Sequence, residues 1–138
     1  MAMHTLTIHG EPASKANSRR LVLIKGRMVP IKSKKALAYA KAFAKQCPAL
    51  DPQMDEDLII AMKIFYASRR PDLDESLILD LLQGPVYKND RAIKMKYIQH
   101  GLSKEHPRVV MAIGPLASAS RVITRYEDLL TEDAKNYL

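Results

Sequence analysis

The stretch from Asp57 to Glu75, DLIIAMKIFYASRRPDLDE, decides the fold that we expect. Its first part, Asp57 to Ala67, is a long apolar run rich in β-branched and aromatic side chains, which is typical of a strand buried on both faces. Pro71 prevents the strand from continuing as a regular ladder. A short amphipathic helix with Asp74 as its N-cap is indicated by Leu77, Ile78, Leu81, Leu82 and the closing Gly84-Pro85. The stretch therefore predicts a central strand whose carboxyl end meets a helix N-terminus.

Further elements are expected on both sides of this strand. Extended segments are predicted for residues 6–9, 86–87, 92–100 and 108–113, and a hairpin for residues 21–31 around Lys25-Gly26-Arg27. A helix capped by Ser33 is expected from Lys34 to Gln46, with a buried stripe of Leu37, Ala40, Phe43 and Ala44. We therefore predict one α+β domain over residues 1–138, in which a mixed β-sheet packs with two main helices.

The tail, residues 116–138, indicates a C-terminal peripheral helix. Its acidic face is expected from Glu127, Asp128, Glu132 and Asp133. Two interpretations remain open, since such a helix either contacts a partner subunit or frays.

Length and composition limit the class of protein. A chain of 138 residues suits a single domain with a sizeable core. The one cysteine, Cys47, cannot pair within the chain, which indicates a reducing compartment. No apolar run approaches the roughly 18 residues of a membrane span, and the N-terminus has no secretory leader pattern. We expect a soluble, cytoplasmic protein with no membrane partner.

The distribution of charge points to an anionic partner. The net charge is +7, from 22 basic and 15 acidic residues. Between Pro12 and Lys45 there are ten basic residues and no acidic one. Such a block is typical of a phosphate-binding face, and the alternative is a solvated basic surface that aids solubility.

Three aspartates form the candidate metal site. Asp72 and Asp74 are two residues apart, so their side chains share one face of an extended backbone, and we expect Asp90 to return beside them across a strand–helix–strand turn. Carboxylates that face one point suit Mg²⁺, which keeps several waters and takes few protein ligands. The chemistry indicated is phosphodiester cleavage. The structural alternative makes Asp74 an N-cap, Asp90 a turn residue and Asp72 a solvated loop acid.

The order of these motifs resembles a known family. Gly10-Glu11-Pro12 with Ser14-Lys15, a helix with Lys34-Lys35, Arg70-Pro71-Asp72-Leu73-Asp74 and Tyr87-Lys88-Asn89-Asp90 follow one another as in the RusA-type Holliday junction resolvases. The resemblance covers about residues 5–115 and leaves residues 116–138 outside. It implies a homodimer that cuts branched DNA by paired nicks, with Mg²⁺, or Mn²⁺ as a substitute, bound by Asp72, Asp74 and Asp90 as the catalytic residues.

The chain departs from the family pattern at three positions. Glu75 stands where the family usually has Asn, Ile78 where it has a lysine, and Asn89 where it has the first of two aspartates. The lysine matters most, because a cation beside the scissile phosphate stabilises the charge that develops in the transition state. Lys88, or a basic residue of the loop 15–20, is the expected substitute.

Basic residues along the chain are expected to contact phosphates, giving affinity that falls steeply with salt. They are Lys15, Arg19, Arg20, Lys32, Lys34, Lys35, Arg69, Arg70 and Lys88. The sequence thus predicts a Mg²⁺-dependent, structure-selective endodeoxyribonuclease of DNA recombination and repair. One alternative is a non-catalytic nucleic-acid-binding protein with structural acids. Another is an RNA nuclease or RNA-binding domain, although aromatic pairs that stack bases are not evident.

Overall fold

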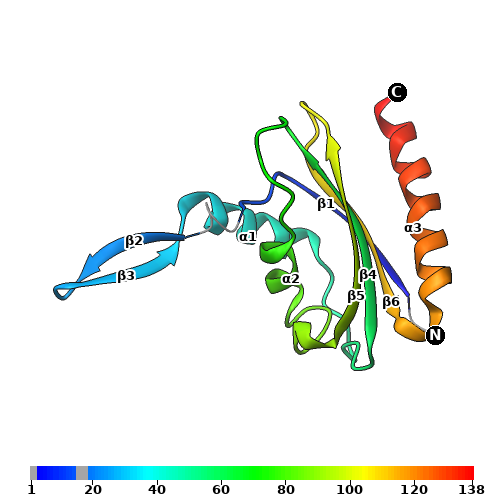
Figure 1. Ribbon diagram of the computed structural model, residues 1–138, viewed down its shortest axis with the longest axis horizontal. Helices are drawn as coiled ribbons and strands as arrows, with labels where there is room; N and C mark the ends of the chain where they lie inside the picture. The colour runs from blue at the N-terminus through cyan, green and yellow to red at the C-terminus, as the bar shows by residue number, and fades with distance from the viewer. Residues whose placement is uncertain (1–2, 15–18) are drawn as a thin grey trace.

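A mixed four-stranded sheet forms the centre of the molecule (Figure 1). The computed structural model describes residues 3–14 and 19–138, apart from the side chain of Arg19. The strands lie in the order β1 (His4–His9), β6 (Arg108–Pro115), β4 (Leu58–Tyr66) and β5 (Ile93–Leu102). β4 is parallel to β5 and antiparallel to β6, and β1 is antiparallel to β6. The prediction of an α+β fold with a mixed sheet is confirmed.

The central strand β4 is buried on both faces because each face meets a helical layer. Leu58, Ile60, Met62, Ile64 and Tyr66 enter the larger core, on the side of α1 (Lys34–Gln46) and α2 (Ser76–Leu82). Ile59 and Ala61 point the other way, into a smaller core beneath α3 (Ala119–Ala134). Figure 1 shows the two short helices on one side of the sheet and α3 on the other.

The start of α1 is as expected, but its buried face is not. The Ser33 hydroxyl accepts a hydrogen bond from the Ala36 N–H at 3.2 Å, as an N-cap residue does. The buried side chains are Ala36, Tyr39 and Phe43, whereas Leu37 is 51% exposed. The predicted buried stripe through Leu37 was therefore wrong, because the helix is rotated about its axis. Of the residues predicted for that stripe, only Phe43 is fully buried.

The helix α3 covers the sheet rather than fraying from it. Val122 and Tyr126 are fully buried against the sheet. Asp133, expected on a solvated acidic face, is only 6% exposed and forms an ion pair with Arg108 of β6 at 2.7 Å. A peripheral helix does follow the sheet, as predicted, but it begins at residue 119 and its last turn is anchored. The described part of the chain also has 3₁₀ turns at η2 (Asp90–Ala92), η3 (Leu116–Ser118) and η4 (Lys135–Tyr137).

The expected hairpin forms a sheet of its own. β2 (Arg19–Ile24) and β3 (Arg27–Lys32) pair only with each other, and they project from the body on the side of α1 (Figure 1). Both turn residues, Lys25 and Gly26, have positive φ (50° and 78°), which is the type I′ geometry that suits two-residue hairpins. The extended segment expected at residues 86–87 is reduced to isolated bridges from Tyr87. In the described part of the chain, every helix is too short or too polar to cross a bilayer.

Candidate site at the carboxyl end of β4

The loop that follows β4 folds back over the sheet and is held by Tyr66. The Asp74 N–H donates a hydrogen bond to the Tyr66 hydroxyl at 3.1 Å. The Asp74 carboxylate accepts one from the Ser76 N–H at 2.9 Å, so this aspartate closes a local turn at the start of α2. α2 begins two residues after the predicted N-cap. Asp74 is half-buried and Asp72 is exposed on the same loop.

A third carboxylate reaches this position from another strand. Glu11 follows β1 and accepts a hydrogen bond from the Ala67 N–H at 2.6 Å, immediately after β4. Its second oxygen accepts from the Lys35 ammonium of α1 at 3.0 Å. Glu11 therefore ties β1, α1 and the carboxyl end of β4 together. We call Glu11, Tyr66, Asp74 and Glu75 the Tyr66 cluster.

The carboxylates of the Tyr66 cluster contribute to a raised pKa of the Tyr66 phenol. Burial raises the pKa of Tyr66, and the hydrogen bond from the Asp74 N–H partly offsets that effect. The charges of Asp74, Glu11 and Glu75 raise the pKa further, because each disfavours a phenolate nearby. Tyr66 therefore stays protonated and serves as a neutral anchor for the loop. His100 lies beside it, with ring centroids 4.9 Å apart.

Two lysines bring positive charge to the cluster. The Lys96 ammonium of β5 contacts the Glu75 carboxylate at 2.7 Å, and Lys35 contacts Glu11 as described above. Lys96 pairs in register with Ile60 of β4, so its side chain leaves the sheet on the face that carries Tyr66. Ile78, where the resembled family has its lysine, is fully buried in the core.

Asp90 does not join Asp72 and Asp74 in this chain. It opens η2 just before β5, and its N–H donates to the Gln83 side chain at 2.8 Å, beyond the C-terminal end of α2. Asp74 lies at the other end of α2, whose seven residues alone rise by about 10 Å. The predicted convergence was wrong because β5 is parallel to β4. Its start pairs with the start of β4, whereas Asp74 follows the end of β4.

The predicted metal-ligand set therefore does not fit one ion within one chain. Across residues 3–14 and 19–138, no three side chains of His, Cys, Asp or Glu are grouped so that they could hold a metal. What remains is a pair of carboxylates, Asp72 and Asp74, on one loop. Mg²⁺ often takes only one or two carboxylates and keeps its waters, so the donor chemistry of this pair suits the ion.

The predicted phosphate contacts fall into separate regions. Arg69 and Arg70 are exposed on the loop beside the Tyr66 cluster, and Lys34 and Lys35 are exposed at the start of α1. Lys88 is exposed near Asp90, at the opposite edge of the sheet, so it cannot replace the family lysine in this chain. Arg20 and Lys32 belong to the hairpin. Lys15 and the side chain of Arg19 lie outside the described residues.

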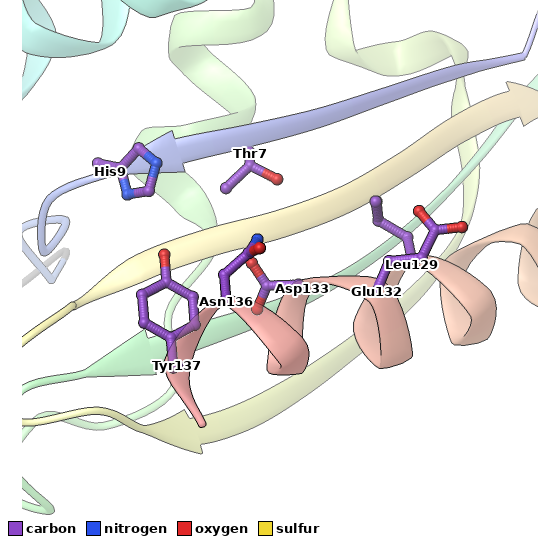
Figure 2. A pocket seen from close by; sticks show the side chains of 7 residues that line it. All are labelled: Thr7, His9, Leu129, Glu132, Asp133, Asn136 and Tyr137. Atoms are coloured by element: carbon purple, nitrogen blue, oxygen red, sulfur yellow. The ribbon is translucent and has the colours of Figure 1, made fainter.

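A hollow of about 370 Å³ lies on the other face of the sheet (Figure 2). Its lining residues come from β1, α3 and η4, and they are Thr7, His9, Leu129, Glu132, Asp133, Asn136 and Tyr137. The carboxylate of Asp133 is already bound to Arg108 there. The hollow is therefore separate from the Tyr66 cluster, and its two acids, Glu132 and Asp133, are paired with Arg125 and Arg108.

Sequence reasoning missed Glu11, Tyr66 and Lys96 as members of the site. A signal for Glu11 was present, because parallel strands direct their carboxyl ends to the same edge, and β1 and β4 both run toward it. Lys96 had no comparable signal, since its position depends on the register of β5 against β4.

A scan against models of protein families finds no match. A search of curated proteins finds no significant match either.

Proposed function

We propose that this chain is a structure-selective endodeoxyribonuclease that resolves four-way DNA junctions by paired nicks. The observation that carries the proposal is the Tyr66 cluster itself, in which carboxylates from β1 and from the loop after β4 gather around one buried phenol. The exposed Arg69 and Arg70 lie on the same loop. Acids that face a phosphate-binding surface suit phosphodiester hydrolysis.

The cofactor in this proposal is Mg²⁺, with Mn²⁺ as a substitute. Asp72 and Asp74 are the residues that would hold it, without Asp90. When bound, the ion would supply positive charge for a phosphoryl oxygen and favour ionisation of a water nucleophile.

The remaining roles belong to side chains of the chain itself. Arg69 and Arg70 would bind the phosphates on either side of the cut, where their exposure leaves them accessible to a strand. Lys96 is the cation that we assign to the developing charge in the transition state, because Glu75 already directs its ammonium toward the cluster. Lys96 would thus supply the positive charge that the family's lysine gives at the position of Ile78.

The partners follow from the reaction. Two opposed strands must be cut, and one chain holds one Tyr66 cluster, so we propose a homodimer on branched DNA. We place the protein in the cytoplasm, in keeping with a single cysteine that cannot pair within the chain.

Cleavage of a labelled four-way junction tests the proposal. Asp72→Asn and Asp74→Asn should each lower the single-turnover cleavage rate by at least about a hundredfold, while junction binding measured in EDTA is kept. Asp90→Asn is the matched control, because the same change is made at the far end of α2. It should stay within about threefold of the wild type.

Two results would contradict the proposal in different ways. Absence of incision by the wild-type protein at every Mg²⁺ and Mn²⁺ concentration would exclude the nuclease. An Asp90→Asn variant as slow as Asp74→Asn would instead show that the ligand pair assigned here is incomplete.

A second candidate is a junction-binding protein without catalysis. It is favoured by the ion pairs of Glu11 and Glu75 with Lys35 and Lys96, which neutralise two of the three carboxylates in the cluster. Under this alternative Asp74→Asn changes only stability or affinity, because Asp74 serves to close the turn before α2.

A further inference from the structure

The hairpin formed by β2 and β3 exposes more apolar surface than a solvated arm normally carries. We call its described side chains, residues 20–32, the arm. Leu21, Leu23 and Met28 are 65%, 69% and 59% exposed. The pairs Leu21–Pro30 and Leu23–Met28 lie directly opposite each other, so these side chains share one face of the ribbon. A two-stranded hairpin is marginally stable alone in water, so a binding surface that covers this face would stabilise it.

The charge of the arm indicates which class of partner would cover its apolar face. By the register of the hairpin, Lys32 lies on the apolar face at its base, Lys25 lies at the turn, and Arg20 and Arg27 lie on the opposite face. The arm has no acidic residue. Lys25 stands at the turn, where its positive φ places it at the tip. A second copy of this chain carries a net charge of +7 and is a poor electrostatic match. A polyanion with exposed apolar groups matches both the charge and the apolar face of the arm.

We propose that the arm inserts its apolar face, Leu21, Leu23, Met28 and Pro30, between unstacked bases at the branch point of a DNA junction. Its cations then contact the phosphates on either side. This inference rests on the proposed function and names the part of the substrate that the arm recognises. A two-stranded ribbon fits a DNA groove, and apolar side chains such as Leu, Met and Pro act as wedges that separate base steps.

Branched DNA suits such a wedge better than a duplex does. Unstacking a base step in a regular duplex costs a few kcal/mol, and that cost is lower where stacking is already interrupted. The arm would therefore give preference for junctions without reading sequence. The type I′ turn keeps β2 and β3 paired up to the tip, so the apolar side chains are presented on a preformed ribbon.

Fluorescence of 2-aminopurine placed at the branch point tests the wedge. The full chain is mixed with this junction in Ca²⁺, so that strands stay uncut, and base unstacking by the wild type should raise the emission. The variant Leu23→Thr/Met28→Thr keeps strand propensity but removes a cross-strand apolar pair. We expect it to lose the rise in emission and about tenfold in junction affinity, with duplex affinity nearly unchanged.

Two matched variants separate the apolar effect from folding and from charge. Leu23→Met/Met28→Leu changes the same two positions, keeps the apolar face and should behave as the wild type. Lys25→Ala/Arg27→Ala should weaken junction and duplex binding alike and reduce the slope of log affinity against log salt by about two. Thermal unfolding of each variant checks the body of the molecule.

The outcomes distinguish this inference from the function on which it rests. If the wild type prefers and cuts junctions but the threonine pair unstacks bases equally well, the wedge is excluded and the nuclease stands. If the threonine pair instead turns a dimer into a monomer in sedimentation, the arm covers a second copy and the wedge is likewise excluded. If the wild type shows no preference for branched DNA, both proposals fail together.

Discussion

The buried ion pair between Asp133, in the last turn of α3, and Arg108 of β6 gives the sharpest quantitative prediction. Asp133 and Arg108 are 6% and 3% exposed, and the guanidinium lies between the rings of Phe65 and Tyr137, 3.9 Å from each centroid. The perturbation is Asp133→Asn, which keeps the shape of the side chain and removes its charge. Arg108 is then left buried without a counter-charge.

The expected loss follows from the contacts of one oxygen. Asp133 Oδ2 accepts hydrogen bonds from Arg108 Nε at 3.0 Å and Nη2 at 2.7 Å, and in asparagine an NH₂ group or a weaker neutral oxygen must face these donors. Two hydrogen bonds to a charged group, at about 1.5–3 kcal/mol each, agree with the roughly 3–5 kcal/mol measured for broken buried pairs. For a chain of this size the midpoint of thermal unfolding should fall by about 10–20 °C.

Urea and thermal denaturation, followed by circular dichroism at fixed protein concentration, measure the change. The matched control is Glu132→Gln, one residue away. Its ion pair with Arg125 at 3.1 Å is exposed and should be worth less than about 1 kcal/mol. The double replacement Arg108→Met/Asp133→Leu should recover most of the loss, since apolar pairs often replace buried ion pairs. A loss in Asp133→Asn no larger than in Glu132→Gln would refute the reasoning.

Four further predictions concern buried groups elsewhere. Tyr87→Phe removes the hydroxyl that donates to the Leu79 carbonyl at 2.7 Å and should cost about 1–2 kcal/mol in urea denaturation. Tyr39→Phe removes a buried hydroxyl that has no partner in the described part of the chain and should be neutral or stabilising; equal losses in the two variants would contradict this. Gly114→Ala should lower the thermal midpoint by the equivalent of about 1–3 kcal/mol, because a Cβ there lies 2.7 Å from Val122 Cγ2. An unchanged midpoint would show that α3 can move away. Above about pH 10 the free energy of unfolding should fall, because tyrosines ionise in the unfolded chain while burial raises their pKa in the native protein. This stability is complete below pH 10, and ultraviolet titration of tyrosinate should find late ionisation of Tyr39, Tyr66, Tyr87 and Tyr126.

The elements that sequence predicted well are those whose pattern is independent of their partners. The apolar run at β4 is long enough to require burial on both faces, and the structure buries it between two helical layers. Gly26 predicted the hairpin turn because a positive φ is needed there. In both cases local chemistry and the final fold impose the same requirement.

The buried face of α1 shows why composition can mislead. Leu37 is the most apolar residue near the start of the helix, yet it is exposed, while Ala36 and Tyr39 face the core. A small side chain lets the helix approach the sheet closely, and the Tyr39 ring packs beside Gly10, 3.7 Å from where a Cβ on that glycine would stand. The fit between α1 and the segments packed against it therefore decided which face of the helix is buried. It outweighed the free energy that burial of Leu37 would have gained.

The error at Asp90 has a topological cause. A strand–helix–strand unit brings the chain back to the edge of the sheet from which the first strand started whenever the two strands are parallel. The spacing of the acids in the sequence does not distinguish this return from an antiparallel one. Asp90 and Lys88 are therefore placed near the start of β4, and Asp74 near its end.

The same sheet topology explains why Glu11 meets the loop that follows β4. His9, Arg108 and Phe65 lie in one row across β1, β6 and β4, so Glu11 leaves β1 at the edge where β4 ends. The Gly10 N–H donates to the Pro107 carbonyl, which fixes that exit beside the start of β6. Acids at this edge come from two strands that run in the same direction, and their meeting does not depend on how the chain returns to β5. In the proposed function Asp72 and Asp74 hold the ion, and Glu11 positions their loop through its hydrogen bond from the Ala67 N–H. A double-mutant cycle between Glu11 and Asp74 would measure that coupling directly.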